Sequence, residues 1–262
     1  MGILNLTPDS FSDGGKYPCI KSAVAAAQKM IADGADILDL GGESTRPGSD
    51  PVDVETELQR VIPVLEALPK NQVLLSVDSQ KPEVQAAALA TGAHIINDVS
   101  GGNDTLFKMA GEYQAGLILM HTPATPKYMQ SHTDYPDVLE AVAEFLSTQI
   151  ERAKAYPIPA LWADPGIGFG KTLEQNLSLM RQLERFRFPD CGIILGASRK
   201  TWIGHLTGAE VDNRLAGSLV ALVAAILQNV EIIRVHDVAA SVQARAVTTA
   251  LFRSPIAISG IE

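Results

Sequence analysis

Residues 73–98 read VLLSVDSQKPEVQAAALATGAHIIND, and the fold class can be inferred from the pattern of this stretch. An apolar run, Val73 to Val77, leads into a polar turn and has the length of a buried strand. A helix is expected from Pro82 to Thr91, because proline suits the first helical turn and Gly92 follows where a left-handed residue ends a helix. A second apolar run, His94 to Asn97, comes next. The stretch therefore predicts a strand, a helix and another strand.

The same pair of strand and helix recurs along the whole chain, with a period of about thirty residues. Strands are expected at Gly2 to Leu6, Ile37 to Leu40, Val73 to Val77, His94 to Asn97, Gly116 to Met120, Ala160 to Ala163, Gly192 to Gly196 and Ile232 to Val235. Helices are expected at Ile20 to Asp33, Val54 to Leu68, Pro82 to Thr91, Thr105 to Tyr113, Pro136 to Tyr156, Leu173 to Arg185, Asn213 to Gln228 and Ala239 to Phe252.

Eight alternating units with right-handed crossovers close most naturally into a (β/α)8 TIM barrel. The length of 262 residues agrees with the roughly 250 that such barrels need. No linker or low-complexity tract divides the chain, so we expect one domain over residues 1–262. An open doubly wound sheet is the structural alternative.

The composition excludes several classes of protein. A hydrophobic content of 46% with only 5% aromatics suits buried parallel strands covered by helices and argues against disorder. The net charge of −9 argues against nucleic acid or an anionic membrane as a partner, because both are bound by clustered Lys and Arg. Any bound anion must therefore be held by local positive charge.

The cysteines and the apolar runs indicate a cytoplasmic protein. Cys19 and Cys191 are the only two cysteines and lack metal or redox spacing, so both are expected to be structural residues in a reducing compartment. The longest apolar run, Leu219 to Leu227, is far shorter than the roughly 20 residues of a membrane span.

Polar residues follow nearly every predicted strand, where a barrel of this kind carries its active site. In chain order they are Asn5 with the loop Thr7 to Gly15, Gly41 to Gly48, Asp78 with Ser79, Asn97 with Asp98, His121, Asp164 to Lys171, Ser198 to Thr201, and Arg234 with His236 and Asp237.

These clusters have both structural and functional interpretations. Asp78, Asn97 and Ser198 precede helices, where such residues commonly serve as N-caps. Arg234 and His236 are separated by one residue at the end of an apolar strand and so point to the same side, which favours an anion site. Lys200 opens the unit before the last, near the place where barrels often bind phosphate.

Two familiar motifs nearly match and are rejected. Gly166 to Thr172 resembles a P-loop, but Pro165 stands where the first glycine is required. Gly196 to Lys200 resembles a nucleophile elbow, but its closing glycine is replaced by lysine. No group of His, Cys and Glu has zinc spacing. Covalent serine catalysis and a structural metal are therefore not expected.

In their order, the strand-end motifs closely resemble those of the dihydropteroate synthase family. The resemblance is carried by NLTPDSFSDGG at 5–15, GESTRPG at 42–48, SVD at 76–78, IIND at 95–98, DPGIGFGK at 164–171, SRK at 198–200 and IRVHD at 233–237. It covers essentially the whole chain, and the first two strings are individually rather specific.

The resemblance implies an enzyme of folate biosynthesis, a transferase. The family joins p-aminobenzoate to the methylene carbon of a 7,8-dihydropterin diphosphate, releasing diphosphate and forming dihydropteroate, with Mg2+ assisting. It implies a homodimer formed through helices in the C-terminal half. A pterin-binding barrel that passes the methyl group of methyltetrahydrofolate to a corrinoid protein is the alternative, and an inactive pterin-binding paralogue is a second. The first would have little use for Arg234, His236 or the loop at Thr45.

By resemblance, each part of the reaction has its own residues. Catalysis would rest on Lys200, Asp78, Arg234 and His236. The pterin pocket would be lined by Asp78, Asn97, Met120, Asp164, Phe169, Gly196 and Lys200. The diphosphate would meet Asn5, Arg234 and His236, with Mg2+ held between phosphate oxygens and Asn5.

The aminobenzoate site is expected on two loops and a helix start. Thr45, Arg46 and Pro47 match the family's second mobile loop, and Asp9 to Gly15 match its first. Ser198 and Thr201 would hold the aminobenzoate carboxylate, since helix N-termini favour anions.

Departures from the family pattern are few. Ile167 stands where many members have Phe, and Thr122 follows His121; both are expected to alter packing rather than chemistry. The family commonly has a leading segment under the barrel, and its absence ahead of Met1 would lower stability and leave the site intact. The loop from Thr45 to Pro51 carries no insertion, as in sulfonamide-binding members.

Overall fold

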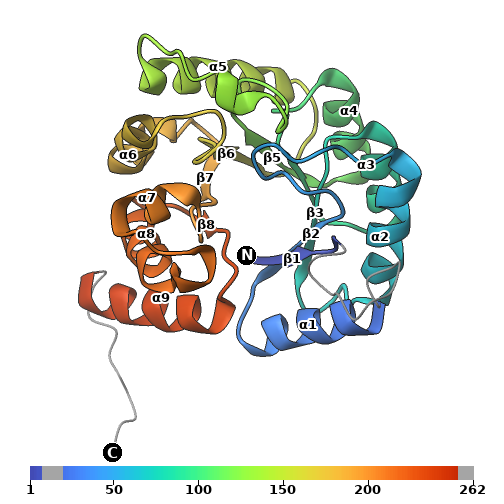
Figure 1. Ribbon diagram of the computed structural model, residues 1–262. Coiled ribbons are helices and arrows are strands. Elements are labelled where there is room, and N and C mark those ends of the chain that lie inside the picture. The colour runs from blue at the N-terminus through green and yellow to red at the C-terminus, as the bar shows by residue number, and fades with distance from the viewer. Residues whose placement is uncertain (8–19, 253–262) are drawn as a thin grey trace, which may run out of the picture.

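The structure, a computed structural model, describes residues 1–7 and 20–252. Its eight strands form one parallel sheet in the order of the chain. They are β1 (Gly2–Asn5), β2 (Ile37–Gly41), β3 (Leu74–Asp78), β4 (Ile95–Asp98), β5 (Gly116–Met120), β6 (Leu161–Asp164), β7 (Gly192–Leu195) and β8 (Ile232–Ile233). The helices around them are α1 (Ile20–Ala32), α2 (Val54–Ala67), α3 (Pro82–Thr91), α4 (Asp104–Tyr113), α5 (Val138–Ala153), α6 (Leu173–Arg181), α7 (Thr201–Thr207), α8 (Leu215–Leu227) and α9 (Val238–Phe252), as Figure 1 shows.

The sheet closes on itself just beyond β8. Gly2 and Val235 pair as parallel neighbours. Ile3 donates its backbone N–H to the Val235 carbonyl at 2.9 Å, and Val235 donates to the Met1 carbonyl at 2.9 Å. The predicted (β/α)8 TIM barrel is confirmed, and the open doubly wound sheet is excluded.

Side chains alternate between two cores, as the pleat of a strand requires. Leu38, Leu75 and Leu117 are fully buried in the large core between the sheet and the helices. A separate apolar cluster fills the lower interior of the barrel; its buried members are Ile37, Ile95, Ile118, Ile194 and Ile232. Above this cluster, toward the carboxyl ends of the strands, polar side chains occupy the barrel interior.

Several element ends differ from the predicted ones. Helix α5 begins at Val138, two residues after the predicted start, because the Asp137 carboxylate caps it by accepting from the backbone of Leu139 and Glu140. Helix α6 ends at Arg181, and α7 was not predicted as a separate helix. Gly92 ends α3 with a φ of 97°, as predicted.

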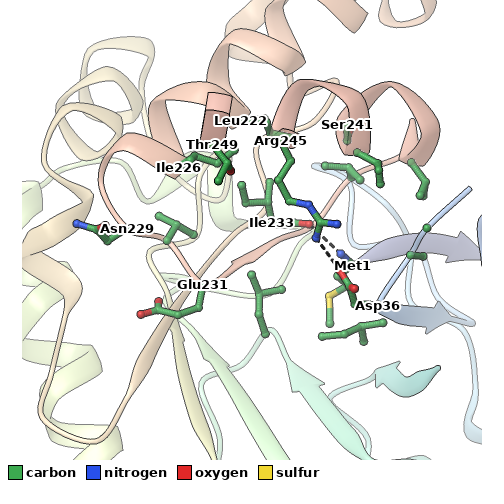
Figure 2. Close-up of a pocket in the computed structure, with 18 of the residues that line it drawn as sticks. Met1, Asp36, Leu222, Ile226, Asn229, Glu231, Ile233, Ser241, Arg245 and Thr249 are labelled. Atoms are coloured by element: carbon green, nitrogen blue, oxygen red, sulfur yellow. Dashed lines mark hydrogen bonds and ion pairs between the residues drawn. The ribbon is translucent and has the colours of Figure 1, made fainter. Parts of the chain in front are cut away.

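The amino-terminal end of the barrel holds a cavity of about 510 Å3, shown in Figure 2. Its lining includes Met1, Asp36, Ile226, Glu231 and Arg245, and none of the predicted site residues lines it. Arg245 donates to Asp36 at 3.0 Å, and both residues line the cavity, as Figure 2 shows. Among the described residues, no helix is long and apolar enough to cross a membrane.

Candidate functional site

Four neighbouring strands bring residues at or next to their carboxyl ends to one level of the barrel. Asn5 pairs with Gly41, Gly41 with Asp78, and Asp78 with Asn97. Gly41 leaves a gap in this row, because a Cβ there would lie 3.9 Å from the Asp78 Cβ and 4.0 Å from Asn5 Oδ1. The predicted residues of β1, β3 and β4 therefore face one space.

Arg234 joins this row from the end of β8, the strand that closes the barrel against β1. Its Nε donates to Asp39 Oδ2 at 2.6 Å, and one terminal nitrogen donates to Asp78 Oδ2 at 2.8 Å. Asp39 is fully buried and also accepts from Ser76 Oγ at 2.6 Å and Asn97 Nδ2 at 3.1 Å. Burial lowers the pKa of Arg234, but the two carboxylates outweigh it and raise this pKa above its usual value.

Asp78 keeps one acceptor free for a ligand. Its Oδ1 is buried and has no hydrogen-bond partner among the described residues. Burial raises the pKa of Asp78 to about 7, although the adjacent Arg234 opposes the shift. A buried acceptor without a donor costs free energy, which a ligand with N–H groups would recover.

Asp164, Gly196 and Lys200 form the other side of the space. Asp164 Oδ1 accepts from the Gly166 backbone at 2.8 Å. A Cβ on Gly196 would lie 3.9 Å from Asp164 Oδ2 and 4.0 Å from Arg234 Cδ, so glycine leaves room between these two charged groups. Burial, followed by the charge of Arg234, lowers the pKa of Lys200 to about 8.

An apolar wall borders these charges. Met120 and Phe169 are buried in one cluster with Val99 and Met129. The Lys200 ammonium lies 4.0 Å from the centre of the Phe169 ring, a cation–π contact. A cavity of about 190 Å3 runs along this wall, lined by Phe169 and by residues of the loops after β4 and β5.

His236 is a neutral imidazole held by a hydroxyl group. Burial and the charge of Arg234 lower its pKa to about 4. The Ser198 hydroxyl lies 3.1 Å from His236 Nδ1 and 3.3 Å from the His236 backbone nitrogen, which donates to it. Arg199, with a φ of 56°, fixes this loop through a two-bonded pair with Asp237 at 2.9 and 2.6 Å.

The residues predicted to bind aminobenzoate do not form one cluster, unlike those predicted for the pterin. Thr45, Arg46 and Pro47 lie on a half-exposed loop whose tip docks on the loop after β5, since the Gly48 N–H donates to the Pro126 carbonyl at 3.1 Å. Thr201 is exposed at the first position of α7. The predicted first loop, Asp9 to Gly15, and Cys19 lie outside the described residues.

Two charged groups of the site were missed in the sequence. Asp39 lies within β2 rather than after it; its only signal was a carboxylate at an alternate position in an apolar strand. Lys171 stood in a quoted motif without a role, and it is buried against His121, 50 residues away in the chain.

The chain matches the family described as pterin binding enzyme over residues 1–236. It is 46% identical over 254 residues to dihydropteroate synthase of Escherichia coli (strain K12), which covers 95% of this chain and 90% of that protein. It is 40% identical to the dihydropteroate synthase of Synechocystis, covering 97% and 90%.

Solved structures agree with the sequence relatives. Dihydropteroate synthase from Xanthomonas albilineans with 4-aminobenzoic acid superimposes with a TM-score of 0.90 at 43% identity, covering 97% of this chain and 93% of that one. The Thermus thermophilus enzyme in complex with 6HMPPP gives a TM-score of 0.84 at 40% identity, covering 96% and 93%. The chain therefore belongs to the dihydropteroate synthase family, pterin-binding transferases of folate biosynthesis.

Proposed function

We propose that the strand-end site binds a 7,8-dihydropterin diphosphate and p-aminobenzoate and joins them into 7,8-dihydropteroate. The arylamine nitrogen forms a bond to the methylene carbon, the carbon–oxygen bond to diphosphate breaks, and its electron pair leaves with diphosphate. The arylamine proton passes to water. The observation that carries the proposal is the buried Asp78 Oδ1, which has no hydrogen-bond partner among the described residues. It lies among the other polar residues at the strand ends.

The pterin ring is assigned to the space between Asp78, Asn97, Asp164 and Lys200. Its amino group and ring N–H would donate to carboxylates, and its carbonyl would accept from Lys200. Met120 and Phe169 would flank the ring, with Gly196 leaving space for its edge. Support comes from the Thermus thermophilus relative, which was solved with 6HMPPP.

The diphosphate is assigned to Asn5, Arg234 and His236 at the rim of this pocket. The terminal nitrogen of Arg234 that does not bond Asp78 has no carboxylate partner among the described residues, which leaves N–H groups for a phosphate oxygen. His236 is uncharged at neutral pH, so it would donate a hydrogen bond from Nε2 while Nδ1 faces Ser198.

The residues present fit a magnesium ion that is shared with the substrate. In residues 1–7 and 20–252 no group of three or more His, Cys, Asp or Glu side chains could hold a metal alone. Mg2+ often takes one or two protein oxygens and several waters, and the Asn5 amide oxygen borders the gap at Gly41. When bound, the ion would neutralise charge that develops on the leaving diphosphate.

Catalysis would rest on stabilising the leaving group and on positioning. Arg234 and His236 would stabilise diphosphate as it departs, and Lys200 and Asp78 would hold the electron-deficient pterin methylene in line with the amine. A strong general base is not required.

The aminobenzoate is assigned to Thr45, Arg46, Pro47, Ser198 and Thr201. The Ser198 hydroxyl already faces His236, so it would link the carboxylate and diphosphate sites. Relatives solved with 4-aminobenzoic acid and with a sulfonamide drug support the choice of this substrate, and we propose sulfonamides as competitors here.

We further propose one domain over residues 1–262, a cytoplasmic location and a homodimer. Large apolar side chains are exposed on neighbouring helices, including Val220 of α8, at 69%, and Val247 and Leu251 of α9, at 59% and 70%. Such a patch commonly marks a contact between proteins.

The proposal is tested by incubating the purified protein with Mg2+, the dihydropterin diphosphate and p-aminobenzoate. Dihydropteroate and diphosphate are expected in equal amounts, as measured by chromatography and phosphate release after pyrophosphatase. If a folded preparation forms no product while the Escherichia coli enzyme does, the proposal is wrong.

A further inference from the structure

Lys171 is buried, and the proposed mechanism assigns it no role. Only 4% of it is exposed. Its ammonium donates to the Gly166 carbonyl at 3.0 Å, the Phe169 carbonyl at 2.9 Å and His121 Nδ1 at 3.1 Å. His121 can accept because burial and Lys171 lower its pKa to about 3, which keeps the imidazole neutral. All three N–H groups of the ammonium therefore have partners.

Burying a charge here is costly, so the contacts must compensate for it. Burial lowers the pKa of Lys171 to about 7, because the charged form loses its hydration. A methionine of similar length would avoid the penalty, but it would leave the buried Phe169 carbonyl and an imidazole nitrogen without donors and would remove one of the two donors to the Gly166 carbonyl. A lysine at this buried position is thus explained by the hydrogen bonds that it donates to the turn of residues 166–170.

That turn, residues 166–170, has little support of its own. Gly166, Gly168 and Gly170 have φ angles of 68°, 83° and 58°. The one backbone hydrogen bond that closes it runs from the Phe169 nitrogen to the Gly166 carbonyl, at 3.1 Å. Asn176 accepts from the Gly168 nitrogen at 2.7 Å. Glycines gain the most freedom on release, so the turn needs an external clamp.

The turn carries the wall of the candidate pterin pocket. Phe169 projects from it toward Lys200, whose ammonium lies 4.0 Å from the ring centre. At the start of the turn, the Gly166 nitrogen donates to Asp164 at 2.8 Å. Lys171 binds the carbonyls of both Gly166 and Phe169, so it fixes the turn at both ends.

We propose that Lys171 is a positioning residue for pterin binding, which holds the turn 166–170 so that the Phe169 ring stands against the pterin. The inference rests on the proposed function. Lys171 touches no substrate in this arrangement and acts through Phe169.

The test is a double-mutant cycle between Lys171→Met and Phe169→Ala, read as the Kd of 6-hydroxymethyl-7,8-dihydropterin by calorimetry. Lys171→Met is expected to raise Kd about tenfold to a hundredfold, because a loosened turn misplaces the ring. On the Phe169→Ala background the same change is expected to alter Kd by less than about threefold. In turnover, KM for the pterin substrate should rise while KM for p-aminobenzoate stays unchanged.

Leu179→Ala is the matched control, since it empties a fully buried position in α6, the helix that follows the turn, without removing a side-chain hydrogen bond. It should lower the melting temperature and leave the pterin Kd unchanged. Lys171→Gln, which keeps two donors, should recover part of the affinity and serves if the methionine variant does not fold.

Three results would overturn the inference: wild-type Kd in Lys171→Met, an equal loss in Leu179→Ala, or full additivity with Phe169→Ala. Wild-type protein that binds no pterin at all would instead contradict the proposed function.

Discussion

Asp78 and Lys200 face the same pocket with pKa values displaced toward each other, to about 7 and about 8. A pterin needs the carboxylate form of Asp78 as acceptor and the ammonium form of Lys200 as donor. As pH falls through 7 the Asp78 carboxylate is protonated, and as pH rises through 8 the Lys200 ammonium is lost. Pterin affinity is therefore expected to be greatest between these values and to fall on both sides.

Calorimetric titration with the dihydropterin from about pH 5 to about pH 10 measures this profile. Affinity should fall up to about tenfold per pH unit on each limb. Asp78→Asn should bind more weakly and lose the acidic limb. A profile that stays flat in the wild-type protein would contradict the assignment of both residues.

Substitutions of His236 and Arg234 are expected to differ in which ligand they weaken. His236→Ala should weaken binding of the pterin diphosphate about tenfold, the value of one hydrogen bond to a charged group, and leave the pterin without diphosphate unaffected. Arg234→Gln should weaken both ligands, because Asp39 and Asp78 lose their shared cation.

Calorimetry with both ligands distinguishes the two residues. Equal losses in His236→Ala would remove it from the diphosphate site. An Arg234→Gln variant with intact affinity for the bare pterin would show that its ion pairs do not organise the pocket.

At single positions, the sequence predicted most polar residues of the site but not their partners. Asp78, Asn97 and Asp164 could be predicted for the candidate site because they end or follow strands, and the carboxyl ends of the strands carry the site in barrels of this kind. Asp39, which lies inside a strand, was not predicted, nor was the role of Lys171, whose partner His121 is distant in the chain. Such pairings depend on strand register, which a single sequence does not specify.

At the level of elements, Lys81 connects the second loop to two helices. At the start of α3, its ammonium lies 2.6 Å from Glu43 Oε2 and 2.5 Å from Glu57 Oε2. Glu43 Oε2 also accepts from the Val52 nitrogen at 2.8 Å, at the far end of the loop that carries Thr45. The two carboxylates raise the pKa of Lys81 against the opposing effect of burial.

Lys81→Met is therefore expected to lower the free energy of unfolding by about 3–5 kcal/mol, since it leaves two buried carboxylates without a cation. It should also raise KM for p-aminobenzoate, because the loop base is released. Urea unfolding and steady-state kinetics measure the two effects. Lys29→Met, at an exposed pair with Asp33, is the control and should change neither. Full stability in Lys81→Met would refute the role of the cluster.

The eight strands and most helices were predictable because their apolar periodicity is strong. Helix α7 was not predicted, because it is too short to show that periodicity. It has seven residues, too few for the helical period to be recognised, and follows β7 through the strained Arg199. The second loop, with its docking on Pro126, was predicted only as a loop. Its position depends on contacts between segments that are far apart in the chain.

In the whole molecule, the barrel interior has two parts: a lower apolar part that stabilises the fold and an upper charged part that forms the candidate site. Ile95, Ile118 and Ile194 fill the lower interior and stabilise the closed sheet. Asp78, Asp164 and Arg234 fill the upper interior, where their desolvation is tolerated because the charges oppose one another. In a chain with a net charge of −9, Arg234 and Lys200 are cations that lie beside these buried carboxylates.

The outer surface carries the remaining prediction, that the chain dimerises through α8 and α9. Val220→Glu places a charge in the exposed apolar patch and is expected to halve the mass measured by light scattering, because a buried unpaired charge opposes association. Activity per chain should persist, since the matched polar residues of the site all come from one chain. Tyr113→Glu, at the half-exposed end of α4, is the control and should leave the mass unchanged. A wild-type protein that is monomeric at micromolar concentration, or a Val220→Glu variant of undiminished mass, would show that this patch is not the dimer contact.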